Sequence, residues 1–185
     1  MRRTMALAVL IWLSGCGGSK SESTPPGAGA VAATPSFEPC SVLTAAEIEA
    51  TLGWKVVSSR PIPQGAIGYC IYSGPDETAA SGPQKVQAGI GACPTNMPCT
   101  ELPAFGSAAE LVAFRRKGYE GKDLGGLGAT IEPIEDLGVP AIRHELGGLE
   151  AVEMSLGAGR LAFVETWGTA AVARDLAAKV LGRVR

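Results

Sequence analysis

The chain has 185 residues, 46% of them hydrophobic and 18% charged, so it can bury the core of one domain and is not a disordered polymer. Its formal net charge of −2 provides no positive excess to attract a phosphate backbone, so nucleic acid is not an expected partner. Because His144 is the one histidine, a metal site with two imidazoles is excluded, and we expect no metal and no cofactor.

Residues 1–15 have the pattern of an export signal. Arg2 and Arg3 form a positive start, and residues 6–13 are an uninterrupted apolar run of eight. A helix needs roughly 20 apolar residues to span a bilayer, so this run is too short to serve as a membrane anchor. We therefore predict a signal peptide that is removed after export.

The apolar run ends at Cys16, and the preceding residues suggest why. The string "LSGC" (residues 13–16) resembles the lipobox of bacterial lipoproteins. This resemblance implies that the Cys16 thiol receives a diacylglyceryl group and that Cys16 becomes the first residue of the mature chain. Two or three acyl chains such as palmitate, at about 0.8 kcal/mol per buried methylene, anchor a domain stably, so the membrane is the expected partner. The alternative is an ordinary signal peptide followed by an incidental cysteine.

Residues 17–39 are dominated by Gly, Ser, Ala, Thr and Pro. Such a composition cannot bury enough surface to offset its ordering entropy, so residues 16–39 are predicted to be a lipidated N-terminus and flexible linker. Gly17 follows the cysteine where inner-membrane lipoproteins carry Asp. This implies a place in the cell envelope, on the outer membrane where the cell has one and otherwise on the extracytoplasmic face of the cell membrane.

Four cysteines remain in the folded part: Cys40, Cys70, Cys93 and Cys99. An even number in an exported chain predicts two disulfides, although four cysteines allow three connectivities and the sequence alone does not choose between them. The prolines and Asn of "CPTNMPC" favour a short loop that joins Cys93 to Cys99, which leaves Cys40 for Cys70. A zinc site is the alternative, but the spacings lack paired short knuckles.

The first predicted helix follows Cys40. Thr44 and Glu47 match a capping box, and Gly53 is a typical helix end. The side chains expected to face inward are Ala45, Ile48 and Leu52.

Five or six strands are predicted from alternating or continuous apolar runs bounded by Gly, Pro and Ser, two or three of them before the second helix and three after it. They cover residues 54–59, 68–73, 84–92, 140–146, 149–157 and 160–167. In the third of them Val86, Ala88 and Ile90 alternate, which predicts one buried face. The last two are joined by a short glycine-rich turn suited to an antiparallel hairpin.

A second helix is predicted over residues 107–118, with Ser107 and Glu110 as a capping box. Leu111 and Phe114 are expected to face inward. Arg115, Arg116 and Lys117 are interpreted as last-turn cations that complement the helix dipole, with a patch for lipid headgroups or anionic ligands as the alternative.

A C-terminal helix is predicted from Thr169, with Val172, Leu176 and Val180 at helical spacing. Together these elements predict an α+β domain over residues 40–185. Its core is expected to be an antiparallel sheet of about five to six strands with three helices, as a single domain after a flexible tether.

Catalytic motifs are missing from the sequence: it contains no G-x-S-x-G and no H-E-x-x-H, so no catalytic residue is predicted. His144 shares a strand face with Ile142 and Leu146, which favours a half-buried, hydrogen-bonded histidine. The competing hypothesis is an envelope hydrolase that uses His144. Trp54 and Trp167 are interpreted as core residues, or as the lining of a shallow groove.

The strings "PCSVLTAAEIEATLG", "CIYSG", "EDLGVPAI" and "ARDLAAKVL" resemble the secreted lipoprotein domain of unknown function common in actinobacteria and other high-GC bacteria. The resemblance implies a bond between Cys40 and Cys70 beside Tyr72. The family has no established activity to transfer. The function expected from the sequence is a non-catalytic, lipid-anchored cell-envelope lipoprotein whose domain binds an envelope protein or a small ligand.

Overall fold

The computed structural model describes residues 37–64, 67–76, 82–91, 103–119, 129–157 and 159–185. The predicted signal peptide and Cys16 lie outside the described residues, as do Cys93 and Cys99.

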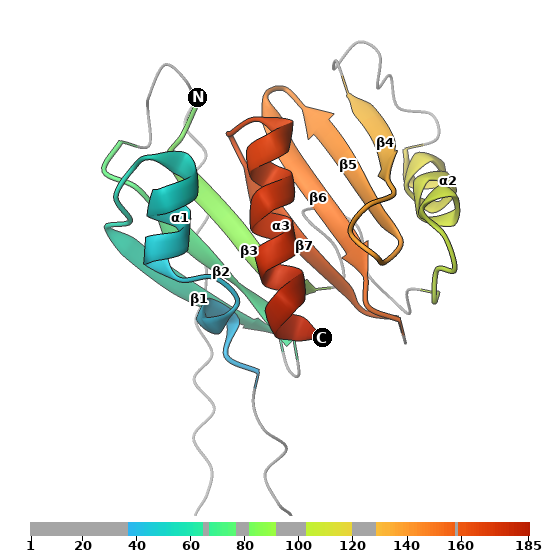
Figure 1. Cartoon of the computed structure of the whole chain (residues 1–185), viewed down its shortest axis with the longest axis horizontal. Helices are drawn as coiled ribbons and strands as arrows, with labels where there is room; N and C mark the ends of the chain where they lie inside the picture. The colour runs from blue at the N-terminus through green and yellow to red at the C-terminus, as the bar shows by residue number, and fades with distance from the viewer. Residues whose placement is uncertain (1–36, 65–66, 77–81, 92–102, 120–128, 158) are drawn as a thin grey trace, which may run out of the picture. The chain divides into compact units, whose positions relative to one another are not determined.

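The folded part is built on one antiparallel sheet of seven strands in the order β1-β2-β3-β7-β6-β5-β4 (Figure 1). The α+β prediction is confirmed, but the sheet has more strands than the five to six expected. The strands are β1 (Ser58–Gln64), β2 (Ile67–Ser73), β3 (Lys85–Gly91), β4 (Thr130–Ile134), β5 (Ala141–Leu146), β6 (Leu149–Ser155) and β7 (Leu161–Thr166).

The sequence prediction was wrong at the two edge strands. The strand predicted at residues 54–59 begins only at Ser58, and β4 was not predicted. β1 contains Pro61 and Pro63, and β4 contains Pro133. Proline weakens the sequence signal of a strand because it cannot donate to the ladder, and for that reason sheets tolerate it at their edges. The same prolines protect both edges from pairing with another chain.

The first face of the sheet is covered by two helices, α1 (Ala45–Leu52) and α3 (Ala170–Val184), which lie side by side in front of it (Figure 1). Ile48 of α1 and Leu176 and Val180 of α3 are fully buried against the sheet. The strands contribute Cys70, Tyr72, Val86, Ala88, Ala141, Val152, Met154, Ala162 and Val164 to this first-face core. Leu52 is half-buried, whereas Ala45 is exposed and its inward prediction was wrong.

Both ends of α1 follow their sequence signals. Thr44 Oγ1 accepts a hydrogen bond from the Glu47 N–H at 3.2 Å, and the Glu47 carboxylate accepts one from the Thr44 N–H at 2.8 Å, so the capping box is confirmed. Gly53 ends the helix with φ of +74°, a left-handed conformation that side chains disfavour.

The third helix, α2 (Ala108–Gly118), lies against β4 and β5 on the second face. A smaller core forms there from Phe105, Leu111, Val112, Ile131, Ile142 and Leu161. Ser107 caps α2 by accepting from the Glu110 N–H at 3.2 Å. The Glu110 carboxylate bonds the Gly106 N–H at 2.7 Å instead of the Ser107 N–H, so only half of the predicted capping box forms.

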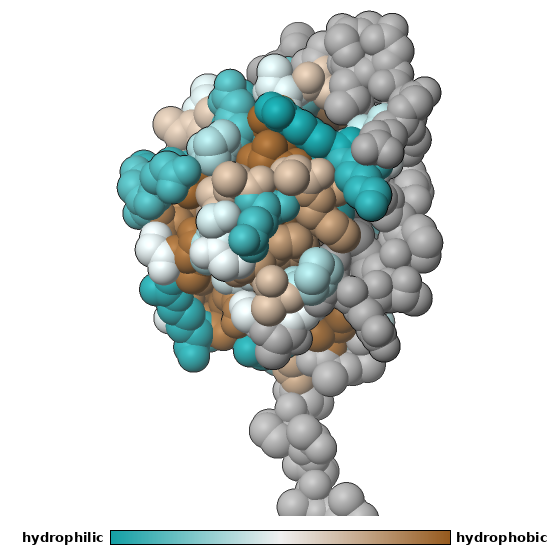
Figure 2. Space-filling model, turned by 90° about the vertical axis from the view of Figure 1, so that its right-hand side faces the viewer, coloured by the Kyte–Doolittle hydropathy of each residue, from teal (hydrophilic) through white to brown (hydrophobic). Residues whose placement is uncertain are grey.

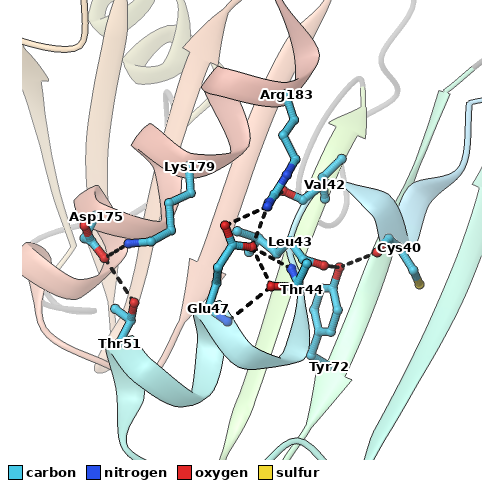
Figure 3. Close-up of polar contacts among 10 residues, drawn as sticks. All are labelled: Cys40, Val42, Leu43, Thr44, Glu47, Thr51, Tyr72, Asp175, Lys179 and Arg183. Carbon is cyan, nitrogen blue, oxygen red and sulfur yellow. Dashed lines mark hydrogen bonds and ion pairs between the residues drawn. The ribbon is translucent and has the colours of Figure 1, made fainter.

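The start of the domain is fastened to the sheet by a disulfide between Cys40 and Cys70 of β2, which confirms this predicted pair. Next to it, the Tyr72 hydroxyl donates to the Leu43 carbonyl at 2.8 Å and lies 3.2 Å from the Cys40 carbonyl (Figure 3). Burial raises the pKa of Tyr72 to about 12, so the hydroxyl keeps its proton at any physiological pH.

Arg183 of α3 adds a second fastening to the same segment (Figure 3). It donates to the Val42 carbonyl at 2.9 Å and to the two Glu47 carboxylate oxygens at 2.7 and 2.6 Å. The hydrogen bond with Arg183 is the main cause that lowers the pKa of Glu47 to about 2. Arg183 thereby bonds α3 to α1 and to the segment that precedes α1.

We predict that the double variant Cys40→Ser/Cys70→Ser loses about 3–4 kcal/mol of unfolding free energy, because the bond closes a loop of about 30 residues in the unfolded chain. Urea denaturation of the oxidised wild type and the variant measures the difference. As a control, the variant is also treated with reductant. Its unfolding midpoint should not fall further on account of positions 40 and 70, because they no longer carry a bond to reduce. An equal midpoint for wild type and variant would contradict the prediction.

Candidate functional site

A row of polar side chains crosses the second face of the sheet. Residues that are direct partners on neighbouring strands share a face, and the register places Gln87, Glu165, Ala151 and His144 side by side on β3, β7, β6 and β5. Glu153 lies in the next row, opposite Ile142 and Phe163. We call Arg115, His144, Glu153 and Glu165 the second-face cluster.

Arg115 joins this cluster from α2. Its Nε donates to Glu153 Oε2 at 2.5 Å, with Arg115 only 3% exposed and Glu153 fully buried. All three cations lie in the last turn of α2, as the helix-dipole interpretation expects, but Arg115 is also buried against a carboxylate, whereas Arg116 and Lys117 are exposed. Figure 2 shows this side of the molecule, where hydrophilic side chains lie along the left and the top of an area of paler and apolar residues.

His144 faces the other oxygen of the same carboxylate. Its Nε2 lies 3.2 Å from Glu153 Oε1, although neither atom forms a well-aligned hydrogen bond with a described residue. The imidazole is mostly buried, as the sequence predicted, with a side-chain exposure of 15%. Burial by itself raises the pKa of Glu153, but His144 and Arg115 outweigh it and hold this pKa below its ordinary value. Glu153 is thus a buried carboxylate between a guanidinium group and an imidazole.

Glu165 is the second buried carboxylate. Its Oε2 accepts a hydrogen bond from the Gln87 amide at 3.2 Å. Burial raises the pKa of Glu165 to about 7, His144 and Lys85 lower it, and Glu153 raises it further. The surroundings therefore lower the pKa of one buried carboxylate and raise that of its neighbour.

The chemistry available to the second-face cluster is limited. No hydroxyl or thiol among the described residues hydrogen-bonds to His144, so the described part of the chain shows no nucleophile beside this base. Within the same residues, no three His, Cys, Asp or Glu side chains are grouped so that they could hold a metal ion. The main effect of the cluster is to pin α2 to the sheet through a buried ion pair.

A second candidate site lies where the segments after α1, before β3 and after β7 come together, near the upper ends of α1 and α3 in Figure 1. Trp54 follows α1, Gln84 precedes β3 and Trp167 follows β7, and together they line a pocket of about 280 Å³. Trp54 packs on the first-face core, whereas Trp167 belongs to neither core cluster. We call this site the tryptophan pocket. The prediction of core packing therefore fits Trp54 and does not fit Trp167.

A glycine allows Trp167 to lie where it does. Gly82 has φ of +100°, and a Cβ at this position would lie 2.8 Å from Trp167 Cδ1. The indole thus rests directly on the backbone at Gly82.

A larger groove of about 610 Å³ runs between α1 and α3. Its floor is formed by alanines such as Ala46, Ala50 and Ala171. Its polar groups already bond one another, because the Thr51 hydroxyl donates to Asp175 at 3.0 Å and Lys179 pairs with the same carboxylate (Figure 3). The groove therefore marks the contact between the two helices, and the polar side chains that line it already bond one another.

The sequence did not indicate that Arg115, Glu153 and Glu165 come together. The sequence did hold one signal for it. Glu153 and Glu165 each occur inside a largely apolar strand, β6 and β7, where a charged residue shares a strand face with apolar neighbours. Two carboxylates of the loop around β4 already have cationic partners, since Glu132 pairs with Arg143 at 3.0 Å and Asp136 pairs with Arg174.

No known protein family, curated protein or solved structure matches the chain. Among the described residues, no helix is both long and apolar enough to cross a membrane.

We predict that Glu165 makes stability fall as the pH rises from about 5 to 8. Its folded pKa of about 7 is raised above the ordinary value of 4.5, so its contribution is fully present below 4.5 and is lost as the pH passes 7. The loss is about 3 kcal/mol. The Glu165→Gln variant, which mimics the protonated acid, should match wild type near pH 4.5 and exceed it by about this amount at pH 8.

Denaturant unfolding of both proteins across this pH range measures the difference. Glu135→Gln, which changes an exposed carboxylate, is the matched control and should retain the wild-type pH profile. Parallel profiles for wild type and Glu165→Gln would contradict the prediction.

Proposed function

We propose that the chain is a lipid-anchored cell-envelope protein whose folded domain is a non-catalytic binding module. The observation that carries the binding role is the tryptophan pocket, a cavity between two half-buried indoles that neither hydrophobic core fills. The lipobox-like "LSGC", the tether after it and the resemblance to the actinobacterial lipoprotein domain support the anchored, extracytoplasmic location.

The disulfide between Cys40 and Cys70 supports the same location, because such bonds persist mainly in exported proteins. A domain that stands on a flexible tether can meet ligands or envelope proteins near the membrane without being embedded in it.

The competing function is a hydrolase that uses His144. The contact between His144 and Glu153 favours it in one respect, since a carboxylate orients the histidine of many general-base pairs. Against it, Glu153 also binds Arg115 under α2, and no described hydroxyl or thiol hydrogen-bonds to the His144 ring. The binding module is therefore the better-supported function.

The anchor is tested by intact-mass measurement and peptide mapping of the protein from the membrane fraction. We expect residues 1–15 to be absent and Cys16 to carry a diacylglyceryl group, and Cys16→Ser to move the protein to the soluble fraction. Recovery of unmodified wild-type protein from the soluble fraction would overturn the anchoring part of the proposal.

The non-catalytic role is tested with His144→Ala against chromogenic esters, amides and glycosides. We expect wild type and variant to give the same rate as buffer. Glu135→Gln serves as the control for purification and folding. A wild-type rate that disappears in His144→Ala, with the variant still folded by near-UV circular dichroism, would replace the binding module by the hydrolase.

A further inference from the structure

We propose that the tryptophan pocket binds one ring of a neutral sugar, with the ring stacked on Trp167 and its hydroxyl groups bonded to the pocket's neutral donors. The inference rests on the proposed binding role and specifies its ligand class.

The charge of the pocket is the first argument. None of the described residues that line it carries a charge; the side chains come from Trp54, Trp167, Gln84, Thr166, Pro83 and Leu52. A charged ligand would give up its hydration without meeting an opposite charge. The ligand that fits this lining is therefore neutral.

The hydrogen-bonding groups of the pocket are the second argument. Neither indole N–H forms a hydrogen bond within the described part of the chain, and the Gln84 amide uses only its oxygen, which accepts from the Asp76 N–H at 3.1 Å. A purely apolar ligand would bury these donors without partners. A sugar ring offers hydroxyl oxygens to the donors and a face of C–H groups to an indole.

The size of the pocket and the edges of the sheet are the third argument. A volume of about 280 Å³ is slightly below the roughly 300–1,000 Å³ of ligand pockets, which suits one ring and not an extended chain. A peptide would use a free sheet edge, but β1 carries Pro61 and Pro63 and β4 carries Pro133. The shape of the site favours the sugar over a peptide.

The walls of the pocket are held in place without a ligand. Trp54 packs on the first-face core, Trp167 rests on Gly82, and the buried Thr166 hydroxyl accepts from the Gly168 N–H at 3.2 Å. A preformed site loses little conformational entropy when it binds.

The test is isothermal titration calorimetry of the full-length protein with maltotriose, mannotriose and chitotriose as probes. We expect at least one to bind saturably, with a Kd that is the same in 50 and 500 mM NaCl because no ion pair forms. Trp167→Ala should raise this Kd at least about tenfold, as loss of an aromatic anchor does. Trp167→Phe, which keeps a stacking ring, should recover most of the affinity.

Gln84→Ala provides a second variant that does not depend on the folding of Trp167→Ala, and it should raise the Kd several-fold. Leu146→Ala, which trims an exposed apolar side chain outside the pocket, is the matched control and should bind like wild type.

Two results separate the ligand class from the binding role. Saturable binding of a tetrapeptide probe to wild type, lost in Trp167→Ala while no sugar binds, overturns the sugar and leaves the binding module standing. Failure of every sugar and peptide probe to bind overturns both. Sugar binding that is unchanged in Trp167→Ala and in Gln84→Ala overturns the assignment to this pocket.

Discussion

Strands β6 and β7 are buried on both faces of the sheet, and this double burial places Glu153 where bulk water does not reach. An ionised carboxylate there is stable only beside a positive group, and Arg115 supplies one from the last turn of α2. The position of α2, and with it the small second-face core, depends on this contact. Among the described residues no cation forms an ion pair with Glu165 on β7, and burial raises the pKa of Glu165 to about 7.

The first face is organised by apolar packing and by the fastening of the start of the domain. The disulfide at Cys70, the Tyr72 hydroxyl and the Arg183 guanidinium all hold the segment between Cys40 and Glu47. Since the predicted tether joins the domain just before Cys40, any pull from a membrane anchor would reach the sheet through this segment. The strongest local bonding of the first face thus lies where a tethered domain would need it.

Much of the fold could be predicted because its signals are local. Caps mark the helices, and continuous apolar runs mark the central strands. The edge strands were missed or shifted because Pro61, Pro63 and Pro133 hide their pattern. The second-face cluster could not be predicted, since it depends on which face α2 covers and on a register that brings Glu153 to Arg115 across 38 residues. The two tryptophans stand 113 residues apart in the sequence, and only the sheet order brings them to one pocket.

The distribution of charge distinguishes the two candidate sites. The charges of the second-face cluster lie under α2, where Glu153 binds Arg115 and faces His144. These side chains are therefore held in place but are poorly accessible to a ligand. The tryptophan pocket has the opposite character, with no charged lining and with indole and amide donors that bond no described residue. Buried ion pairs mainly fix an arrangement, whereas a neutral pocket with unused donors gains most when a ligand supplies the acceptors. The fold therefore separates the groups that hold it together from the groups that are available to a ligand.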